Sequence, residues 1–578
     1  METANNRTIG DILDEIAELL ELKGESSFRV RAYENAASTI RHLPEDIGVL
    51  AEAGRLKSIQ GVGEALAVKI DEYLSTGSMG YLDELRSQFP PGVRRLMSIP
   101  GVGPKLAARA YRELGIESVD ELKQAAEDGR LAALPRLGQR SAENVLRAIA
   151  RSAGQEGERI PIGAALPYVR EIMRRLEGTD VAANVCVAGS VRRFQDTIHD
   201  VDIIATSDDP DGVFDLVLTT PGIREVAARG PTKLSIVTTR GMQVDFRIVP
   251  HEAFGSLLQH FTGSKQHNVQ LREYALKRGQ SLSEYGIMDV ESGQRTAFSD
   301  EQSFYAALDL PWIPPEIRQG TGEIEAAREG RLPKLVSVGD IRGDLHVHTD
   351  WSDGTASLEE MVRAAVTRGY SYLAITDHSP SRGGRPGGLS VDRLRRQAEL
   401  IEEVQRRFPD IHLLRGTEVD IKNDGSLDFP DEVLARLDWV VASIHSTFSM
   451  PAPQMTERML AAIRNPHVDA IGHPTGRVLG GRPPYEMDME AVFQAARETG
   501  TVLEINSFPQ RLDLKDSHVR RAIDLGVMLS VDTDAHSVAE LGQMEFGIEV
   551  ARRGWATPDS VLNTRSYEEL RAALENRL

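Results

Sequence analysis

The sequence predicts a multidomain α+β chain with a helical N-terminal region, a mixed centre, and a C-terminal barrel of alternating strands and helices. The helical region is predicted by apolar residues that recur with helical spacing through residues 7–88. The mixed centre is predicted by two alternating strands that carry aspartates, at 200–202 and at 245. The barrel is predicted by seven apolar runs after residue 341, each ending in polar residues, with helical segments between them.

The composition is that of a globular protein without a secretion or membrane signal. Its 578 residues are enough for several domains, and its hydrophobic content of 41% and charged content of 27% are ordinary. No signal peptide is expected at the polar start, no stretch is long and apolar enough to span a bilayer, and no membrane partner is expected. The single cysteine, Cys186, excludes intramolecular disulfides and is expected to be buried in a strand, which is typical of a cytoplasmic protein.

The net charge of −20 argues mildly against tight nonspecific binding to DNA. The charge is uneven, because more than half of it lies in residues 321–578 and residues 1–155 are close to neutral. Local basic faces therefore remain compatible with the N-terminal part of the chain.

Two helices are expected at the start of the chain. Thr8 is placed to cap the first helix, with Asp11 three residues later. The apolar face of this helix is expected to contain Ile12, Ile16, Leu19 and Leu20. The second helix is expected from Phe28 through Ile40.

Two stretches of the N-terminal region have the pattern of a helix-hairpin-helix. Residues 56–67 contain an apolar residue, a Gly-Val-Gly turn and a new helix, residues 96–107 repeat this order, and residues 134–142 form a weaker third copy. A single Gly-x-Gly turn is often only a helix connector, but two good copies favour sequence-independent binding to the DNA backbone. The expected DNA-binding positions are Gly61, Gly63, Gly101 and Gly103.

The stretch from Gly189 to Asp202 carries the chemistry of the central region. It follows an apolar run at 185–188 that reads as a strand, and it begins with a Gly-Ser turn and two arginines, which suit phosphate oxygens. Asp200 and Asp202 are expected on one strand face, with Asp245 as a third carboxylate on another strand. A lone Asp-x-Asp is often only a solvated strand end, but the turn upstream favours a site for two Mg²⁺ or Mn²⁺ ions.

This stretch resembles the palm of the nucleotidyltransferase superfamily, and in detail that of family X DNA polymerases. By that resemblance residues 1–318 contain a complete family X polymerase. The residues after it are charged and poor in apolar side chains, which predicts a linker at 319–340. The domains implied are a lyase-like domain at 1–88, fingers at 89–155, a palm at 156–248 and a thumb at 249–318.

The resemblance also implies roles for individual residues. Gly189, Ser190 and Arg193 match the turn that binds the triphosphate of an incoming deoxynucleoside triphosphate, and the three aspartates match the catalytic metal ligands. The thumb turn and the positions beside the nucleotide and template are matched by Phe261, Gly263, Asn268 and Arg272. Ile198, His199 and His260 depart from polymerase beta, which leaves sugar discrimination and nucleotide affinity open.

Lys69 matches the Schiff-base lysine of the family's 5′-deoxyribose-phosphate lyase. Such a lysine needs a lowered pKa, whereas the neighbouring Asp71 and Glu72 would tend to raise it. Ala65 replaces a nearby lysine of polymerase beta. A plain surface lysine and a lyase nucleophile therefore both remain open.

The C-terminal region contains nine candidate metal ligands, most of them at the ends of the predicted strands. They are His346, His348, Asp353, His378, Glu418, His445, His473, Asp534 and His536. Imidazole with carboxylate suits Zn²⁺, Mn²⁺ or Fe²⁺, and nine ligands fit two or three ions. A lone histidine at a strand end is usually structural, but six in one set favour a metal centre.

Residues 341–578 resemble the polymerase-and-histidinol-phosphatase (PHP) domain, a distorted (β/α)7 barrel with a trinuclear site. The resemblance implies hydrolysis of phosphoesters by metal-activated water. Arg477 follows a Gly-His-Pro-Thr-Gly turn, and both a phosphate-binding role and a place on the surface remain open for it.

Fused in this way, the chain resembles bacterial family X polymerases that carry a PHP domain. The resemblance implies a monomer that fills short gaps during base excision repair, with a 3′–5′ exonuclease, 3′-end phosphoesterase and abasic-site endonuclease. The implied partners are gapped or nicked DNA, primer-template and deoxynucleoside triphosphates. Two alternatives remain: a DNA-end-binding scaffold with one silent site, and a small-molecule phosphatase tethered to DNA.

Overall fold

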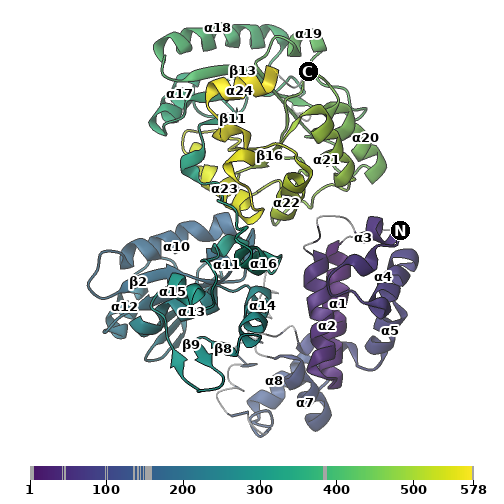
Figure 1. Ribbon diagram of the computed structural model, residues 1–578, viewed down its shortest axis with the longest axis vertical. Coiled ribbons are helices and arrows are strands. Elements are labelled where there is room, and N and C mark those ends of the chain that lie inside the picture. The colour runs from purple at the N-terminus through teal and green to yellow at the C-terminus, as the bar shows by residue number, and fades with distance from the viewer. Residues whose placement is uncertain are drawn as a thin grey trace. The chain divides into compact units, whose positions relative to one another are not determined.

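A computed structural model describes residues 6–41, 43, 47–97, 99, 102–134, 137–138, 142, 145–146, 149, 159–381 and 387–575 (Figure 1). The chain divides into two compact units, Met1–Glu158 and Arg159–Leu578, and each is described by itself. In the described residues, no helix is both long enough and apolar enough to cross a membrane.

The first unit is helical, as predicted. Its helices are α1 (Asn6–Lys23), α2 (Ser27–Arg41), α3 (Ile47–Glu52), α4 (Glu64–Thr76), α5 (Gly80–Ser87), α6 (Pro91–Leu96), α7 (Pro104–Leu114) and α8 (Val119–Glu127). The predicted apolar face of α1 is buried, because Ile12, Ile16, Leu19 and Leu20 all lie in the core of this unit. Burial of this face holds α1 against α2 and α5.

The second unit begins with a five-stranded mixed sheet. Its strands run in the order β2 (Ala183–Val187), β4 (Asp200–Thr206), β7 (Gln243–Ile248), β6 (Lys233–Thr238), β5 (Ile223–Arg229). Helices α10 (Ile162–Leu176) and α12 (Pro210–Leu218) cover one face and share an apolar core with Val201 and Ile203. The opposite face carries Asp200 and Asp202, because side chains alternate along β4.

The thumb region packs on this second face. It contains α13 (Phe254–Thr262), α14 (Lys265–Leu276), a three-stranded sheet of β8 (Gln280–Ser283), β9 (Gly286–Asp289) and β10 (Arg295–Thr296), and α15 (Glu301–Ala306). The segment expected as a linker contains helix α16 (Glu323–Arg328), whose Ile324 and Ala327 join the thumb core. Low apolar content suggested a loose segment, but the buried Glu323 is paired with His267 at 2.7 Å.

The C-terminal region is a parallel seven-stranded sheet, as predicted. Its strands follow chain order: β11 (Gly343–Val347), β12 (Tyr372–Ile375), β13 (His412–Asp420), β14 (Trp439–Ser443), β15 (Ala470–Ile471), β16 (Val502–Asn506) and β17 (Leu529–Asp532). A parallel bridge between Val347 and Ala535 brings the first and last strands together. The sheet therefore closes into a barrel whose carboxyl ends meet at one face.

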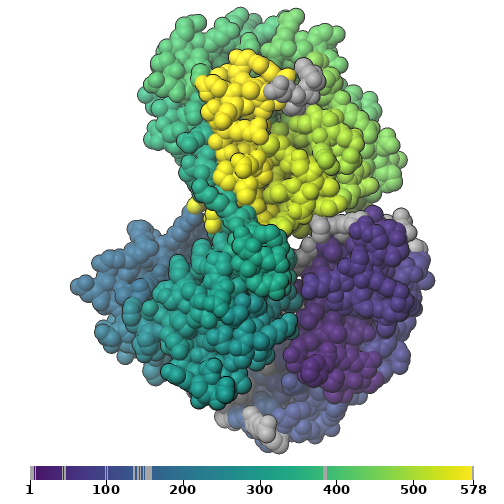
Figure 2. Space-filling view, in the orientation of Figure 1, coloured from purple at the N-terminus to yellow at the C-terminus, as the bar shows by residue number. Residues whose placement is uncertain are grey.

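Helices surround the barrel. They are α17 (Leu358–Thr367), α18 (Val391–Arg407), α19 (Asp431–Leu434), α20 (Ala452–Ile463), α21 (Met489–Thr499), α22 (Asp516–Leu525), α23 (Met544–Arg553) and α24 (Tyr567–Glu575). In the space-filling view the yellow C-terminal residues, including α24, lie against the green part of the barrel (Figure 2). Leu570 of α24 packs with Tyr372 and Trp439 of the strands, so this helix completes the barrel core.

Candidate active sites and metal centre

Strand pairing brings the three palm aspartates together. β4 runs parallel to β7, with Asp202 directly opposite Asp245 in the register. Asp200 is exposed at the start of β4, Asp202 is half-buried and Asp245 is buried. Their side chains therefore gather at one edge of the sheet face that α10 and α12 leave uncovered.

The electrostatics of this cluster favour a cation. Burial, together with Asp200 and Asp245, raises the pKa of Asp202 to about 6, and Arg247 and Lys233 oppose this shift only in part. Asp245 accepts hydrogen bonds from Ser235 and from Gln243 Nε2, the latter at 3.1 Å. Partly desolvated carboxylates that repel one another form the donor set that Mg²⁺ or Mn²⁺ would satisfy.

The predicted triphosphate turn lies directly beside these carboxylates. Gly189 begins the short helix α11 (Gly189–Arg192) with φ +62°, and a Cβ added there would lie 2.9 Å from Asp202 Oδ2. Both the backbone conformation and the close approach therefore require glycine. Ser190 is half-buried, and its carbonyl accepts a hydrogen bond from the Gln195 amide at 2.9 Å, which closes the turn.

Arg193 is directed toward the thumb turn. Its guanidinium donates to the Thr262 carbonyl, and burial, with Arg553 and Arg318 nearby, lowers its pKa to about 10. The preceding Arg192 pairs with the buried Glu301 at 2.7 Å. The two arginines thus connect the palm turn to the thumb, and Arg193 is the one adjacent to the candidate nucleotide site.

The thumb residues predicted to contact nucleotide have defined partners. Phe261 lies under Arg247, whose guanidinium carbon is 4.4 Å from the ring centroid. Gly263 has φ +67°, and a Cβ added there would lie 3.2 Å from Arg193 Nη1. Asn268 donates to the His260 carbonyl at 2.8 Å, while Arg272 is exposed on the same helix.

The two hairpin turns have the same hydrogen-bond pattern. Gly61 has φ +86°, and Gly63 is the N-cap of α4, with its carbonyl accepting from Leu66 and Ala67. Gly103 caps α7 in the same way, whereas Gly101 lies outside the described residues. The two helix N-termini differ in charge, because Glu64 opens α4 and Lys105 lies in the first turn of α7.

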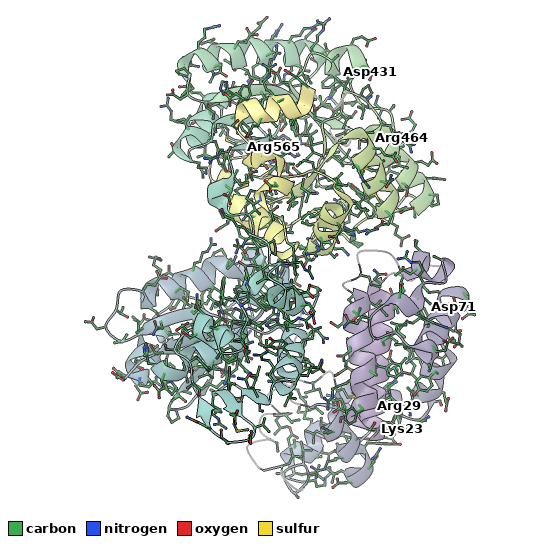
Figure 3. The ribbon with its side chains drawn as sticks, viewed as in Figure 1. Lys23, Arg29, Asp71, Asp431, Arg464 and Arg565 are labelled. Atoms are coloured by element: carbon green, nitrogen blue, oxygen red, sulfur yellow. The ribbon has the colours of Figure 1, made fainter. Side chains whose placement is uncertain are left out.

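Lys69 has a more basic environment than its neighbours in sequence suggested. Its ammonium lies 4.6 Å from the Tyr81 ring centroid, and Tyr81 accepts a hydrogen bond from Arg29 at 2.9 Å. Burial and Arg29 lower the pKa of Lys69, while Glu72 opposes them more weakly. Asp71, labelled on the helical domain in Figure 3, is exposed. The expected raised pKa is therefore wrong, because three-dimensional neighbours outweigh Glu72.

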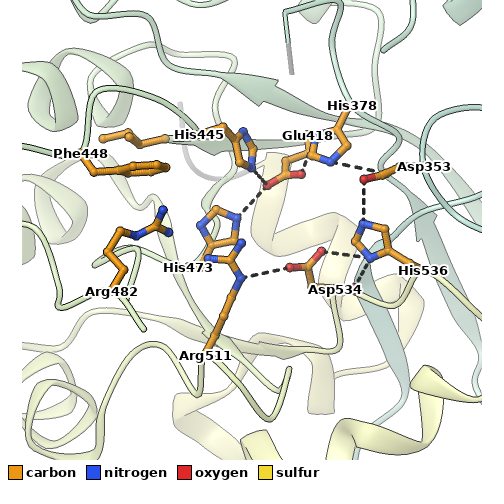
Figure 4. Close-up of a pocket in the computed structure, with 11 residues that line it drawn as sticks. Asp353, His378, Glu418, His445, Phe448, His473, Arg482, Arg511, Asp534 and His536 are labelled. Carbon is orange, nitrogen blue, oxygen red and sulfur yellow. Dashed lines mark hydrogen bonds and ion pairs between the residues drawn. The ribbon is translucent and has the colours of Figure 1, made fainter. Parts of the chain in front are cut away.

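The nine candidate ligands of the barrel converge in one place. They lie on, just after or in the loops following β11–β15 and β17, and most of them line a cavity of about 230 Å³ (Figure 4). Four groups of potential ligand atoms have mutual distances within 4.8 Å. The groups are His348, Asp353, His378 and His536; His346, His348 and Asp534; His378, Asp420 and His445; and Glu418, His445 and His473.

Glu418 lies at the centre of this cluster. Its Oε1 is 3.0 Å from His473 Nε2 and 3.2 Å from His445 Nε2. Its Oε2 is 3.0 Å from His378 Nδ1 and 3.5 Å from His346 Nε2. One carboxylate that faces imidazoles on both oxygens has the geometry of a ligand shared between two cations.

The unsatisfied nitrogens of this cluster fit bound metal. Within the part of the chain that the structure describes, buried imidazole nitrogens of His346, His348, His378 and His473 make no hydrogen bond. Burial, with His536 and His378 nearby, lowers the pKa of His348 to about 3, which keeps its imidazole neutral. A buried imidazole that stays neutral and makes no hydrogen bond, as that of His348 does, is suited to bind Zn²⁺, Mn²⁺ or Fe²⁺.

The last two ligands lie beyond the end of β17. The strand ends at Asp532, and Asp534 has φ +54°, so the backbone bends between the strand and these residues. The bend still brings Asp534 Oδ1 to 3.2 Å from His348 Nε2 and His536 Nε2 to 3.3 Å from Asp353. The backbone departs from the strand where the side chains must converge.

Two buried acids beside the ligands were not singled out from the sequence. The Asp420 carboxylate lies 2.6 Å from His445 Nδ1. The Glu504 carboxylate lies 2.6 Å from His346 Nδ1. Such contacts orient the rings and fix which nitrogen faces a metal. The available signal for Glu504 was a carboxylate in the middle of the apolar run Val502–Asn506.

The cavity also contains two arginines that sequence reasoning missed. Arg511 Nε is 3.8 Å from Asp534, and the Arg482 guanidinium lies 3.5 Å from the centroid of the Phe448 ring (Figure 4). Arg477 is neither a cavity residue nor a surface arginine. It is buried, donates to the Arg511 and Leu512 carbonyls, and pairs with Asp196 of the palm at 2.8 Å.

Family models match four regions of the chain. They are a helix-hairpin-helix domain at 4–79, a SAM-like helix-hairpin-helix tandem at 93–151, a DNA polymerase beta thumb at 257–319 and a PHP domain at 344–507. These matches fall on the hairpin turns, the Gly263 turn and the barrel described above.

Relatives match either the whole chain or the barrel alone. A protein of Bacillus subtilis (strain 168) named "DNA polymerase/3′-5′ exonuclease PolX" is 41% identical over 566 residues, covering 98% of both chains. A probable phosphatase of Thermoanaerobacter sp. (strain X514) is 34% identical over 232 residues, covering 38% of this chain and 89% of the phosphatase. A probable phosphatase of Caldanaerobacter subterraneus is 31% identical over 245 residues, covering 40% and 91%.

Proposed function

Because the chain belongs to the PolX family of DNA polymerases with 3′–5′ exonuclease activity, we propose that its palm fills short gaps during base excision repair and that its barrel trims 3′ ends. The observation that carries this proposal is that the palm aspartates, and separately the barrel imidazoles and carboxylates, each gather at one place in a chain with a full-length match to this relative. Since DNA is the proposed substrate, we place the protein in the cytoplasm.

In the palm, Asp200, Asp202 and Asp245 would hold two Mg²⁺ or Mn²⁺ ions beside the triphosphate turn. Such ions would supply Lewis acidity to the transferred phosphoryl group. Ser190 and Arg193 bind the triphosphate, and Arg193 exchanges its bond with the Thr262 carbonyl for a phosphate oxygen. The turn thereby orients the phosphates toward the primer end.

In the barrel, the nine ligands would hold two or three Zn²⁺, Mn²⁺ or Fe²⁺ ions, which would act as Lewis acids toward a phosphodiester. Glu504 and Asp420 keep the His346 and His445 rings oriented. Arg482 and Arg511 bind the non-bridging phosphate oxygens from the cavity wall. Removal of 3′-terminal phosphates and cleavage at abasic sites follow from the same chemistry.

The test uses one gapped duplex labelled at the primer 5′ end, incubated with Mn²⁺. Extension by the gap length with nucleotides, and stepwise shortening without them, are the expected results. No extension with retained DNA binding would favour the end-binding scaffold. Extension without shortening would separate the barrel from DNA degradation.

A second candidate function is specifically favoured by the barrel's match to probable phosphatases. It is hydrolysis of small phosphomonoesters, with the N-terminal regions as a tether to DNA. A phosphatase assay with a chromogenic phosphomonoester separates the two. Competition by gapped duplex indicates a shared DNA site, whereas unaffected turnover supports the small-molecule phosphatase.

Lys69 is expected to be the nucleophile of a 5′-deoxyribose-phosphate lyase. Partial burial and the basic neighbour Arg29 lower its pKa, and a neutral amine can form a Schiff base. Borohydride should trap wild-type protein on DNA with a 5′-deoxyribose phosphate, and Lys69→Ala should reduce trapping at least about tenfold. Lys123→Ala, which alters an exposed lysine of α8, is the control. Equal trapping by Lys69→Ala would identify a plain surface lysine.

Removal of metal is expected to destabilise the barrel. Ions that bind only the folded state at about 100 times their Kd contribute about 3 kcal/mol to its stability. Treatment with a chelator should therefore lower the melting temperature of the barrel, and added Mn²⁺ or Zn²⁺ should restore it. Asp202→Ala, which alters only the palm, should keep this dependence. Identical melting curves before and after chelation would argue against resident barrel ions.

A further inference from the structure

The segment that follows the triphosphate turn contacts the barrel. Phe194 follows Arg193 directly and Asp196 lies three residues after Arg193, at the point where the palm meets helix α23. Arg553 at the end of α23 has only 4% of its side chain exposed, and its Nη1 donates to the Phe194 carbonyl at 3.0 Å and to Asp196. One barrel side chain thus contacts both Phe194 and Asp196 of this segment.

Asp196 is held between two barrel arginines. Besides Arg553, it pairs with Arg477 Nη1 at 2.8 Å, and 17% of its side chain is exposed. Arg553 Nη2 in turn donates to Asp516 at 2.5 Å. Burial alone would raise the pKa of Asp196, but Arg477 and Arg553 hold it well below its ordinary value. The carboxylate therefore stays ionised within a buried charge network.

The backbone at Phe194 is fixed by the same contact. Phe194 has φ +52°, a conformation that costs free energy for a residue with a large side chain. Its ring packs on Phe546 of α23 with ring centroids 5.5 Å apart, while Arg553 holds its carbonyl. The barrel therefore supplies both contacts that the strained residue needs on its ring and on its oxygen.

The triphosphate turn is consequently held from two sides. On the thumb side, Arg192 is paired with Glu301, which is also bound by the buried Arg318. On the barrel side, Arg553 holds the chain directly after Arg193. A rigid turn presents Ser190 and Arg193 to the phosphates in one geometry, and small displacements there cost binding and rate.

We propose that Arg553 is a positioning residue of the polymerase site, acting through Phe194 and Asp196 on the turn that binds the incoming nucleotide. This inference rests on the proposed nucleotide role of that turn. It makes the barrel a structural part of the polymerase, in addition to its own hydrolytic site. Arg553 is a better residue to mutate than Arg477, because Arg477 also donates to the Arg511 carbonyl beside the hydrolytic cavity.

The test is steady-state gap filling at varied concentrations of one nucleotide, with 3′–5′ degradation measured in parallel. Arg553→Ala should raise KM for the nucleotide about tenfold with kcat within about threefold, as expected when one link of a coupling network is removed. Degradation should stay within about twofold, because Arg553 does not line the barrel cavity. Arg553→Lys, which keeps the charge but loses the fork, should give an intermediate KM.

Arg170→Gln is the matched control. It breaks the exposed Arg170–Glu545 pair, which also joins the palm to α23 but does not include Phe194, Asp196 or Arg553, and should change KM by less than about twofold. Asp196→Asn removes the charge from the palm side and should raise KM even if Arg553→Ala disturbs the barrel. An unchanged KM in both Arg553→Ala and Asp196→Asn, or an equal increase in Arg170→Gln, would overturn the proposal. Absence of extension by wild-type protein would instead reject the proposed polymerase function.

Discussion

Asp202→Ala is expected to reduce primer extension at least about 10³-fold while leaving 3′–5′ degradation unchanged. Extension should fall because the loss of a shared metal ligand removes about 4 kcal/mol or more of transition-state stabilisation. Asp202 is the aspartate in direct register with Asp245, so it is best placed to share cations with the other carboxylates. The measurement is single-turnover extension of a gapped, end-labelled duplex with Mn²⁺.

The fold should tolerate this change. The pKa of Asp202 is raised to about 6 in the folded protein, so its ionised form is disfavoured relative to the unfolded chain. Because the pKa of this carboxyl group is higher in the folded protein than in the unfolded chain, the stability of the fold falls as the pH rises from the unfolded pKa through about 6. Without metal at pH 7, Asp202→Ala should therefore melt at or above the wild-type temperature, and this difference should shrink toward pH 4.

The control for this prediction is Asp208→Ala. Asp208 is an exposed carboxylate just beyond the end of β4, and its loss should change extension by no more than about twofold. Extension at the wild-type rate by Asp202→Ala would reject the palm assignment. A parallel loss of degradation would show that the two activities do not use separate sites.

The palm shows which features of a site can be predicted from the alternation of side chains along a strand. The pattern of β4 correctly predicted that Asp200 and Asp202 share one face, because Val201 and Ile203 must enter the core. It could not predict that Asp245 stands opposite Asp202, since that depends on the pairing of β4 with a strand far along the chain. The orientation of the Arg193 side chain likewise depends on the Thr262 carbonyl of another element.

In the barrel, parallel strands made the convergence predictable. Ligands that end apolar runs meet at the carboxyl face once the strands are parallel and closed. Glu504 was missed because it lies inside β16, where spacing does not separate it from structural polar residues. Asp420 was missed because it ends β13 two residues after Glu418, and its pairing with His445 depends on the neighbouring strand. Arg477 could not be interpreted from its neighbours, since its partner Asp196 belongs to the palm.

His346→Ala is expected to reduce 3′–5′ degradation at least about 10³-fold and to leave extension within about twofold, because the ligand lost lies in the barrel alone. Its Nε2 is buried without a hydrogen bond, while its Nδ1 is 2.6 Å from Glu504, so the ring is oriented toward the metal cluster. The measurement is the rate of shortening of the labelled primer without nucleotides.

His536→Ala separates loss of a ligand from loss of the fold. Removing His346 takes the imidazole partner from the buried Glu504, which keeps only hydrogen bonds from the His473 amide and Asn506, and breaking such a buried pair costs about 3–5 kcal/mol. In contrast, 31% of the His536 side chain is exposed. Both variants should lose degradation, but in the presence of a chelator His536→Ala should melt close to wild type, whereas His346→Ala should melt lower. His412→Ala changes a barrel histidine at the start of β13, stacked on Tyr567, and should retain degradation. Shortening that persists in both ligand variants would place the exonuclease outside this cluster, whereas loss in all three would indicate damage to the barrel.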